Sequence, residues 1–192
     1  LYNMKLSIKN MVCPRCITAV EGLLNDLQLQ PQSVELGEAI IFTEPDETQL
    51  AELRQKLQDQ GFELLEDGKS QVVDRIKSIV INHIHHSDDG NILFSELLAS
   101  ELHKDYSGLS KLFSAQEGIT IEQYIILQKT EKVKELLQYN QLTLSEIADV
   151  LGYSSVAHLS AQFRKTTGVT PSAFRKNSIV SRQPLDAVTK KV

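Results

Sequence analysis

The sequence predicts an α+β domain with strand, helix, strand, strand, helix and strand in that order, followed by an all-α domain. Three observations support this fold class. Residues 4–66 alternate between strand-like and helix-like apolar spacing, the strand-like spacing then disappears, and a group of residues near position 110 recurs near position 160. A chain of 192 residues is long enough for two domains with separate cores.

Short apolar runs, separated by turn and cap residues, define the first domain. We expect strands at residues 4–8, 34–36, 39–42 and 62–64, and helices that begin at Pro14 and after Asp46. Gly37-Glu38 would form the turn of a hairpin, and Gly61 would end the second helix. This order is that of a split βαβ unit, so residues 4–66 are predicted to form a ferredoxin-like βαββαβ domain.

Residues 67–90 are predicted to be a connecting helix and linker. Val73, Ile76, Val80 and Ile84 recur at helical spacing between polar segments at 66–70 and 87–91. Residues 91–177 contain only helical patterns and form the predicted all-α domain. Residues 178–192 are predicted to be a flexible basic tail.

The helical domain contains an internal repeat. Leu109-Ser110, Phe113, Gly118 and Thr120 recur 50 positions later as Leu159-Ser160, Phe163, Gly168 and Thr170. Ala99 and Leu102 recur 49 positions later as Ala148 and Leu151, which implies one more residue in the turn of the second copy. Each copy has the pattern of two short helices with a small alanine where they cross. The repeat therefore predicts two helix-turn-helix units.

One long helical pattern, at residues 121–138, connects the two units. Eighteen residues in a helix extend about 27 Å. Two recognition helices must lie about 34 Å apart to enter successive major-groove segments of DNA. A rigid connector of this order would let one chain place both helices on one face of a duplex, as most helix-turn-helix proteins do only as dimers.

The side chains expected to face DNA lie on the second helix of each unit, opposite the repeated Leu and Phe residues that must face the core. The predicted DNA-binding residues are Ser107, Ser110, Lys111 and Ser114 in the first unit and Ser154, Ser155, Ala157, His158, Ala161, Gln162 and Lys165 in the second. Lysine can reach guanine acceptors and glutamine can reach adenine. Since the other side chains are small, phosphate contacts should supply much of the affinity.

Charge is distributed unevenly along the chain, whose formal net charge is −5 at pH 7. The net charge is −6 for residues 1–66, −3 for residues 67–118 and +4 for residues 119–192. An acidic first part and a basic last part are typical of a chain that meets a polyanion with one part only. An uneven surface without functional meaning is the alternative.

A family resemblance follows from the second repeat. The residues that carry it are 144–155 (LSEIADVLGYSS), His158-Leu159-Ser160, Phe163-Arg164, 167–171 (TGVTP) and Phe174-Arg175. With them, residues 75–177 resemble the DNA-binding domain of the AraC/XylS family of bacterial transcription regulators. The resemblance implies seven helices, two DNA-reading helices, the long connector and activation through contact with RNA polymerase.

Cys13 and Cys16, the only cysteines of the chain, form a CxxC loop between the first strand and the first helix. Two thiolates at this spacing can bind a soft ion such as Cu(I), or Zn(II) with further ligands, and a helix N-terminus favours the thiolate form. With Met11, the loop resembles that of heavy-metal-associated domains, which implies a metal site of Met11, Cys13 and Cys16. A thiol redox sensor and a fold kept only for protein interaction are the alternatives. His83 and His86 would lie on the same face of a helix. They could form an auxiliary metal site, or they could simply be exposed side chains at the end of that helix.

These patterns together predict a sequence-specific DNA-binding transcription regulator that responds to a soft metal ion or to thiol redox state. Its partners would be double-stranded DNA and RNA polymerase, with a homodimer as a further option. The alternative is a metal chaperone or buffer whose helical half binds protein. No catalytic triad, phosphate loop, dinucleotide fingerprint or carboxylate pair is found, so we do not expect an enzyme. No secretory signal or membrane span is expected, which predicts a cytoplasmic location.

Overall fold

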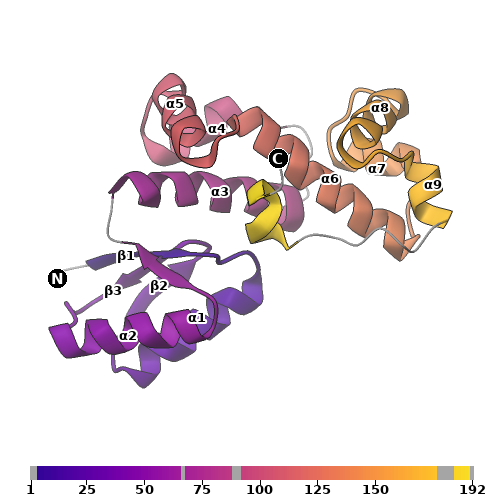
Figure 1. The fold of residues 1–192 in the computed structure, drawn as a ribbon. Coiled ribbons are helices and arrows are strands. Elements are labelled where there is room, and N and C mark those ends of the chain that lie inside the picture. The colour runs from indigo at the N-terminus through magenta and orange to yellow at the C-terminus, as the bar shows by residue number, and fades with distance from the viewer. Residues whose placement is uncertain (1–3, 66–67, 88–91, 177–183, 191–192) are drawn as a thin grey trace. The chain divides into compact units, whose positions relative to one another are not determined.

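The computed structural model describes residues 4–65, 68–87, 92–176 and 184–190 (Figure 1). By its contacts the chain divides into two units, Leu1–Asn82 and His83–Val192. The first unit contains the sheet and the second is helical, which agrees with the predicted order of an α+β part and an all-α part. Within the described ranges, no helix combines the length and the apolar character that a bilayer span requires.

The first unit has the predicted order of strands and helices. Its elements are β1 (Met4–Lys9), α1 (Pro14–Asp26), β2 (Pro31–Glu35), β3 (Glu38–Ile41), α2 (Glu47–Asp59) and β4 (Glu63–Leu65). The strands form one antiparallel sheet in the order β2-β3-β1-β4. In this order each helix joins two strands that are not hydrogen-bonded to each other.

Local sequence signals account for most of these boundaries. Pro14 occupies the first turn of α1, where its missing N–H costs no hydrogen bond. Asp46 caps α2 as predicted, because its carboxylate accepts from the backbone N–H of Gln49 at 2.7 Å and the Gln49 side chain accepts from the Asp46 N–H. The predicted hairpin turn is wrong by one residue: Glu38 pairs with Glu35, so the loop is Leu36-Gly37 and Glu38 begins β3.

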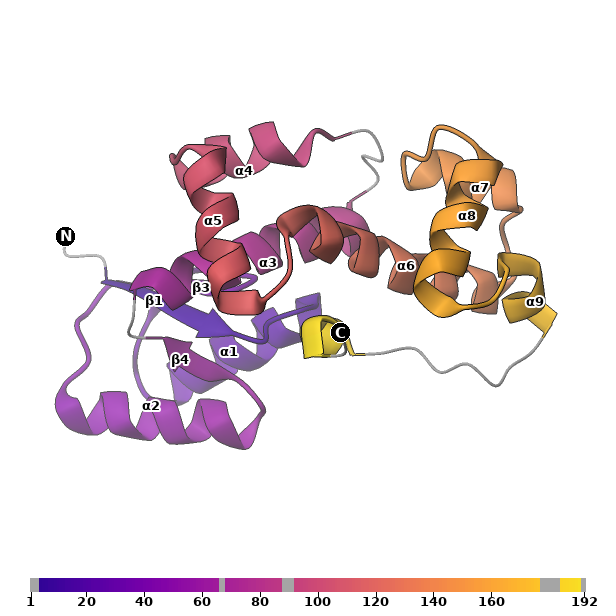
Figure 2. The same ribbon diagram turned by 45° about the horizontal axis from the view of Figure 1, so that its top comes forward.

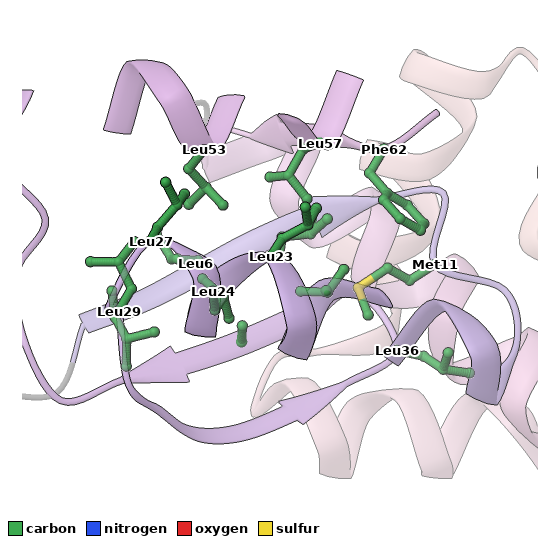
Figure 3. Close-up of a cluster of buried hydrophobic side chains, with 14 residues drawn as sticks. Leu6, Met11, Leu23, Leu24, Leu27, Leu29, Leu36, Leu53, Leu57 and Phe62 are labelled. Carbon is green, nitrogen blue, oxygen red and sulfur yellow. The ribbon is translucent and has the colours of Figure 1, made fainter. Parts of the chain in front are cut away.

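The core of the first unit lies between the sheet and α1 and α2 (Figure 3). Leu6 and Ile8 of β1 face Leu24 of α1 and Leu57 of α2, and all four side chains are buried. Figure 3 also shows Met11 within this cluster, where only 2% of the residue is exposed. Met11, two residues before Cys13, therefore belongs to the packed core.

Seven helices, α3–α9, lie between residues 68 and 176 of the part that the structure describes, as the family resemblance implied. They are α3 (Gly68–His86), α4 (Phe94–Leu102), α5 (Tyr106–Glu117), α6 (Ile121–Tyr139), α7 (Leu144–Val150), α8 (Val156–Thr167) and α9 (Pro171–Lys176). Helix α3 begins in the first unit, where Arg75 donates to the Leu36 carbonyl at 3.0 Å, and ends in the second. The predicted breaks around residues 66–67 and 88–91 lie outside the described residues.

The internal repeat is visible in the bounds of the helices. Helices α5 and α8 are both 12 residues long and are offset by 50 positions at each end. Each ends at a glycine with positive φ, Gly118 at 73° and Gly168 at 82°. The turns before them also contain a positive-φ residue, His103 and Gly152, offset by 49. The extra residue predicted in the second turn therefore lies between Gly152 and α8.

Helix α6 connects the two helical pairs. Its 19 residues correspond to about 28 Å, and it contacts α5 as well as α8 and α9 (Figure 2). Tyr124, Val133 and Leu137 of the predicted apolar side are buried. Buried polar groups also line it, among them an ion pair of Glu131 with Lys134 at 2.5 Å.

Of the predicted flexible tail, residues 178–192, the structure describes residues 184–190, and these are not extended; the rest lies outside the described residues. Leu185–Lys190 form a 3-10 helix, η1, that packs against α6. Val188 is buried, and the Leu185 carbonyl accepts a hydrogen bond from Gln128 of α6 at 2.9 Å. Because this segment is short and basic residues lie on both sides of it in the sequence, its apolar residues Leu185 and Val188 did not indicate a helix.

Candidate nucleic-acid interface and thiol pair

Helix α8 has a polar outer face, and residues at its N-terminus are hydrogen-bonded to one another. Ser155 is the N-cap, and its hydroxyl accepts from the His158 backbone N–H at 3.1 Å. The Ser154 hydroxyl lies 3.1 Å from Nδ1 of His158, which orients the imidazole at the start of the helix. Most of the predicted DNA-binding residues of the second helix-turn-helix unit are exposed: Ser154, Ser155, Ala157, His158, Ala161 and Lys165.

Gln162 differs from the other predicted residues of α8 because it is half-buried. Its side-chain oxygen accepts a hydrogen bond from the Tyr153 hydroxyl at 2.8 Å. The Tyr153 ring is itself buried, and burial raises its pKa to about 12. This bond occupies one of the two acceptor positions of the Gln162 oxygen and orients the amide, so Gln162 can still donate and accept in the two-bond pairing with adenine.

Helix α5 has a corresponding face in the first helix-turn-helix unit. Asp105 is its N-cap and accepts from the backbone N–H groups of Ser107 and Gly108 at 2.9 and 3.0 Å. Hydrogen bonds from Ser107 and Gly108 hold the pKa of the Asp105 carboxyl below its usual range, so it is ionised near neutral pH. The predicted residues Ser107 and Lys111 are exposed, whereas Ser110 and Ser114 are half-buried.

The two helices differ in charge. The described exposed face of α8 carries Arg164 and Lys165 and no carboxylate, whereas α5 has Lys111 together with Asp105 at its N-terminus. Arg164, exposed in the last turn of α8, was missed by the sequence reasoning, although it stood in the signature that carried the resemblance. Arg175 of α9 donates to the Leu142 carbonyl at 2.8 Å and so connects α9 to the segment just before α7.

Cys13 and Cys16 lie together at the N-terminus of α1. Their sulfur atoms are 3.4 Å apart and both side chains are half-buried. Burial raises the pKa of the Cys13 thiol, but hydrogen bonds from Cys16 and Arg15 outweigh it and hold that pKa below its ordinary value. Burial raises the pKa of Cys16. Cys13 is therefore the sulfur that loses its proton first, stabilised by its neighbour.

The other predicted metal ligands have different surroundings. Met11 packs in the core of the first unit. The ring of His83 meets that of Phe94 edge-on at 6.4 Å. Among the described residues, no group of three or more His, Cys, Asp or Glu side chains is arranged to hold a metal ion. An auxiliary histidine metal site therefore gains no support from the geometry.

Known proteins resemble the helical part of the chain. Residues 98–177 match the family model described as "Helix-turn-helix domain". A probable transcriptional regulator, LumQ, of Photobacterium leiognathi is 31% identical over 104 residues. The Msm operon regulatory protein of Streptococcus mutans is 30% identical over 104 residues. The solved C-terminal domain of AraT, a response regulator of Geobacillus stearothermophilus, aligns with a TM-score of 0.52 at 26% identity and covers 60% of this chain and 92% of its own.

Residues 98–177 therefore contain a helix-turn-helix domain, and the helical part resembles DNA-binding domains of the AraC type. Its two helix-turn-helix units are α4 with α5 and α7 with α8. Both curated matches cover 54% of this chain, but only 42% of LumQ and 36% of the Msm protein, so the chain spans less than half of these relatives. The relatives are regulators, in agreement with the prediction that the chain is not an enzyme.

Proposed function

We propose that the chain is a transcription regulator that binds duplex DNA in a sequence-specific way through α5 and α8. The observation that carries this proposal is the matched pair of 12-residue helices, offset by 50 positions, each with an N-cap, an αL glycine end and a polar outer face. A helix of this length fits the major groove, and the N-terminus of α8, which is capped by the neutral Ser155, favours phosphate.

The two helix-turn-helix units would contribute unequally to the affinity for DNA. The Arg164 and Lys165 side chains give α8 two cations without a carboxylate, which suits phosphate contact. The Asp105 carboxylate at the N-terminus of α5 opposes an approaching phosphate, so the first helix-turn-helix unit should supply fewer electrostatic contacts. We therefore propose that α8 supplies most of the affinity and that α5 adds selectivity.

Selection from a pool of random duplexes tests this proposal. We expect enrichment of a site with two blocks about 10 base pairs apart and an affinity that falls steeply as salt is raised from 50 to 200 mM. Replacing Arg164 and Lys165 by Ala should weaken binding and lower the salt slope by about 1 for each phosphate contact removed. The matched control is Lys56→Ala, which removes a charge from α2. Absence of binding at 50 mM salt would refute the proposal.

We propose further that the first unit is a ferredoxin-like, heavy-metal-associated type of domain whose Cys13 and Cys16 bind a soft metal ion. The strand order β2-β3-β1-β4 with its two helices and the 3.4 Å separation of the sulfurs support this proposal. Among the described residues no His, Asp or Glu side chain joins the two thiols, so the site suits Cu(I), which accepts few soft ligands, better than Zn(II), which favours four.

A titration of the reduced chain with Cu(I) tests the metal proposal. We expect tight binding that the Cys13→Ser/Cys16→Ser variant lacks, and equal affinity in the two proteins would refute it. The redox alternative predicts a mass loss of two hydrogens on mild oxidation as the sulfurs join. Repeating the DNA measurement with Cu(I) shows whether the two domains are coupled. Contact with RNA polymerase and dimer formation stay predictions.

A metal chaperone whose helical half binds protein is the second candidate. The pair of sulfurs at the N-terminus of α1 is the observation that favours it. It predicts Cu(I) binding without any affinity for duplex DNA, so the two titrations together separate it from the regulator.

A further inference from the structure

The turn of the second helix-turn-helix unit is one residue longer than that of the first. In the first, only the exposed Lys104 lies between the positive-φ residue His103 and the N-cap of α5. In the second, Tyr153 and Ser154 lie between Gly152 and the N-cap of α8. Since the first unit folds with the shorter turn, the added residue is not needed to form a helix-turn-helix.

Tyr153 is fixed in place by its surroundings. Its backbone N–H donates to the Ala148 carbonyl at 2.8 Å, and its ring is buried in a hydrophobic cluster with residues of α6, α7 and α8. The Lys129 ammonium, which donates to the Leu151 carbonyl at 2.6 Å, lies 5.3 Å from the centre of the ring. The Tyr153 hydroxyl is therefore held at one position beside α8.

The longer turn orients two side chains of α8. The Tyr153 hydroxyl donates to the side-chain oxygen of Gln162 at 2.8 Å. The Tyr153 ring meets the His158 imidazole edge-on at 5.4 Å, and the Ser154 hydroxyl lies 3.1 Å from Nδ1 of the same imidazole. His158 and Gln162 are four residues apart, so they are neighbours on one face of the helix.

Helix α5 has different residues at the corresponding positions. Gly108 and Leu112 stand 50 positions before His158 and Gln162. Neither has a side chain that can form a hydrogen bond, so nothing at these positions of α5 could be oriented by a hydroxyl. The longer turn and the two polar side chains that it orients thus occur together, in one copy of the repeat. Because both copies fold, this coincidence favours a role in recognition over a role in folding.

An oriented glutamine is suited to one base. Glutamine pairs with adenine through two hydrogen bonds in the major groove, in which the amide donates to N7 and its oxygen accepts from N6. The Tyr153 hydroxyl takes one of the two acceptor positions of the Gln162 oxygen, and the second position can accept from N6. A side chain that is held beforehand also loses less rotamer freedom when it meets the base.

We propose that Tyr153 is a positioning residue that presets Gln162 to read one adenine in the major groove. The His158 imidazole lies beside that amide, and because Nδ1 faces Ser154, Nε2 is the ring nitrogen that can meet the DNA next to the adenine. This inference rests on the proposed function and deepens it, since it names one base of the block that α8 contacts. Reading of the base by Gln162 and orientation of Gln162 by Tyr153 can be tested separately.

Selection from random duplexes with the unchanged chain and with Gln162→Ala locates the base. We expect one position at which the unchanged chain prefers adenine by about 10- to 100-fold in affinity and at which Gln162→Ala shows no preference. Replacing that adenine by 7-deazaadenine removes the N7 acceptor, so it should weaken binding of the unchanged chain about tenfold and leave binding of Gln162→Ala unaffected. If both proteins select the same bases, the reading role of Gln162 is refuted.

Tyr153→Phe keeps the ring and removes only the hydroxyl. It should reduce the preference for adenine about three- to tenfold. A hydroxyl that only stabilises the fold would instead change the affinity for every duplex alike. The matched control is Tyr139→Phe, which removes an exposed hydroxyl at the end of α6 and should leave the preference unchanged. An unchanged preference in Tyr153→Phe would overturn the positioning role.

NMR relaxation of the Gln162 side-chain amide tests the orientation without DNA. The amide should be nearly as rigid as the backbone of α8 in the unchanged chain and more mobile in Tyr153→Phe. A mobile amide in the unchanged chain would refute the preset orientation even if Gln162 reads adenine. Absence of DNA binding at 50 mM salt would refute the proposed function and the reading role with it, whereas the NMR result would be unaffected.

Discussion

Protonation of His85 is expected to destabilise the helical unit in mild acid. Burial, chiefly, lowers the pKa of this imidazole from 6.5 to about 4, and the nearby charges of Lys132 and His86 act in the same direction. The hydrogen bond with Gln128 and the charge of Glu135 oppose the shift. Between pH 6.5 and 4 the unfolded chain binds a proton here and the folded chain does not, so each step down in pH favours the unfolded state.

The size of the effect follows from the shift. A change from 6.5 to about 4 corresponds to about 3 kcal/mol at 1.36 kcal/mol for each pKa unit. The stability is fully present above pH 6.5, is lost as the pH falls toward 4, and changes no further below that. Since whole domains are stable by about 5–15 kcal/mol, a loss of this size is readily measured.

Urea unfolding of the unchanged chain and of His85→Gln between pH 7 and pH 4.5 isolates this contribution. The carboxylates titrate in both proteins, so they cancel in the difference. Four of the five tyrosines lie in the helical unit and there is no tryptophan, so tyrosine fluorescence reports mainly on that unit. We expect the difference in unfolding free energy to change by about 2–3 kcal/mol over this range. A constant difference, or an NMR titration that gives His85 a pKa near 6.5, would refute the reasoning.

Three further predictions concern packing, capping and thiol reactivity. Phe163→Ala should lower the unfolding free energy of the helical unit by about 3–5 kcal/mol, because Phe163 is buried against the Phe174 ring at 5.6 Å; a loss below 1 kcal/mol in urea unfolding would contradict this. Thr143→Ala breaks the capping box of α7 and should cost about 1 kcal/mol in the same assay, whereas no loss would show that the cap is dispensable. At pH 7 iodoacetamide should modify Cys13 before Cys16 by peptide mass spectrometry, and the reverse order would show that the hydrogen bonds to Cys13 are too weak to matter.

The features that the sequence predicted well depend on neighbouring residues. The Asp46 cap and the Pro14 start of α1 are local signals, and the structure has both. The repeat was also predictable, because Phe113 and Phe163 occupy equivalent core positions and each copy had to preserve them. The outward direction of Lys111 and Lys165 follows from the same periodicity.

The features that could not be predicted depend on segments far apart in the chain. The last turn of α3, the middle of α6 and the end of α7 together line one cavity. No spacing in the sequence indicates that His85 of α3 meets Gln128 of α6. The contact of Lys129 with Leu151 carries no motif either. Met11 suited a metal-binding loop by its position, but as an apolar residue it suited the core equally well, and only the fold places it there.

The duplication has a consequence for the orientation of the bound protein. A homodimer presents the same helix twice and so selects a palindrome, on which its two orientations are equivalent. Here α5 and α8 share length and offset but differ in side chains and charge. On the proposed function, the DNA site of this chain would be asymmetric and would have a direction. Each binding site would then fix which end of the protein lies upstream, so the sequence of the site would determine the heading of the bound regulator along the DNA.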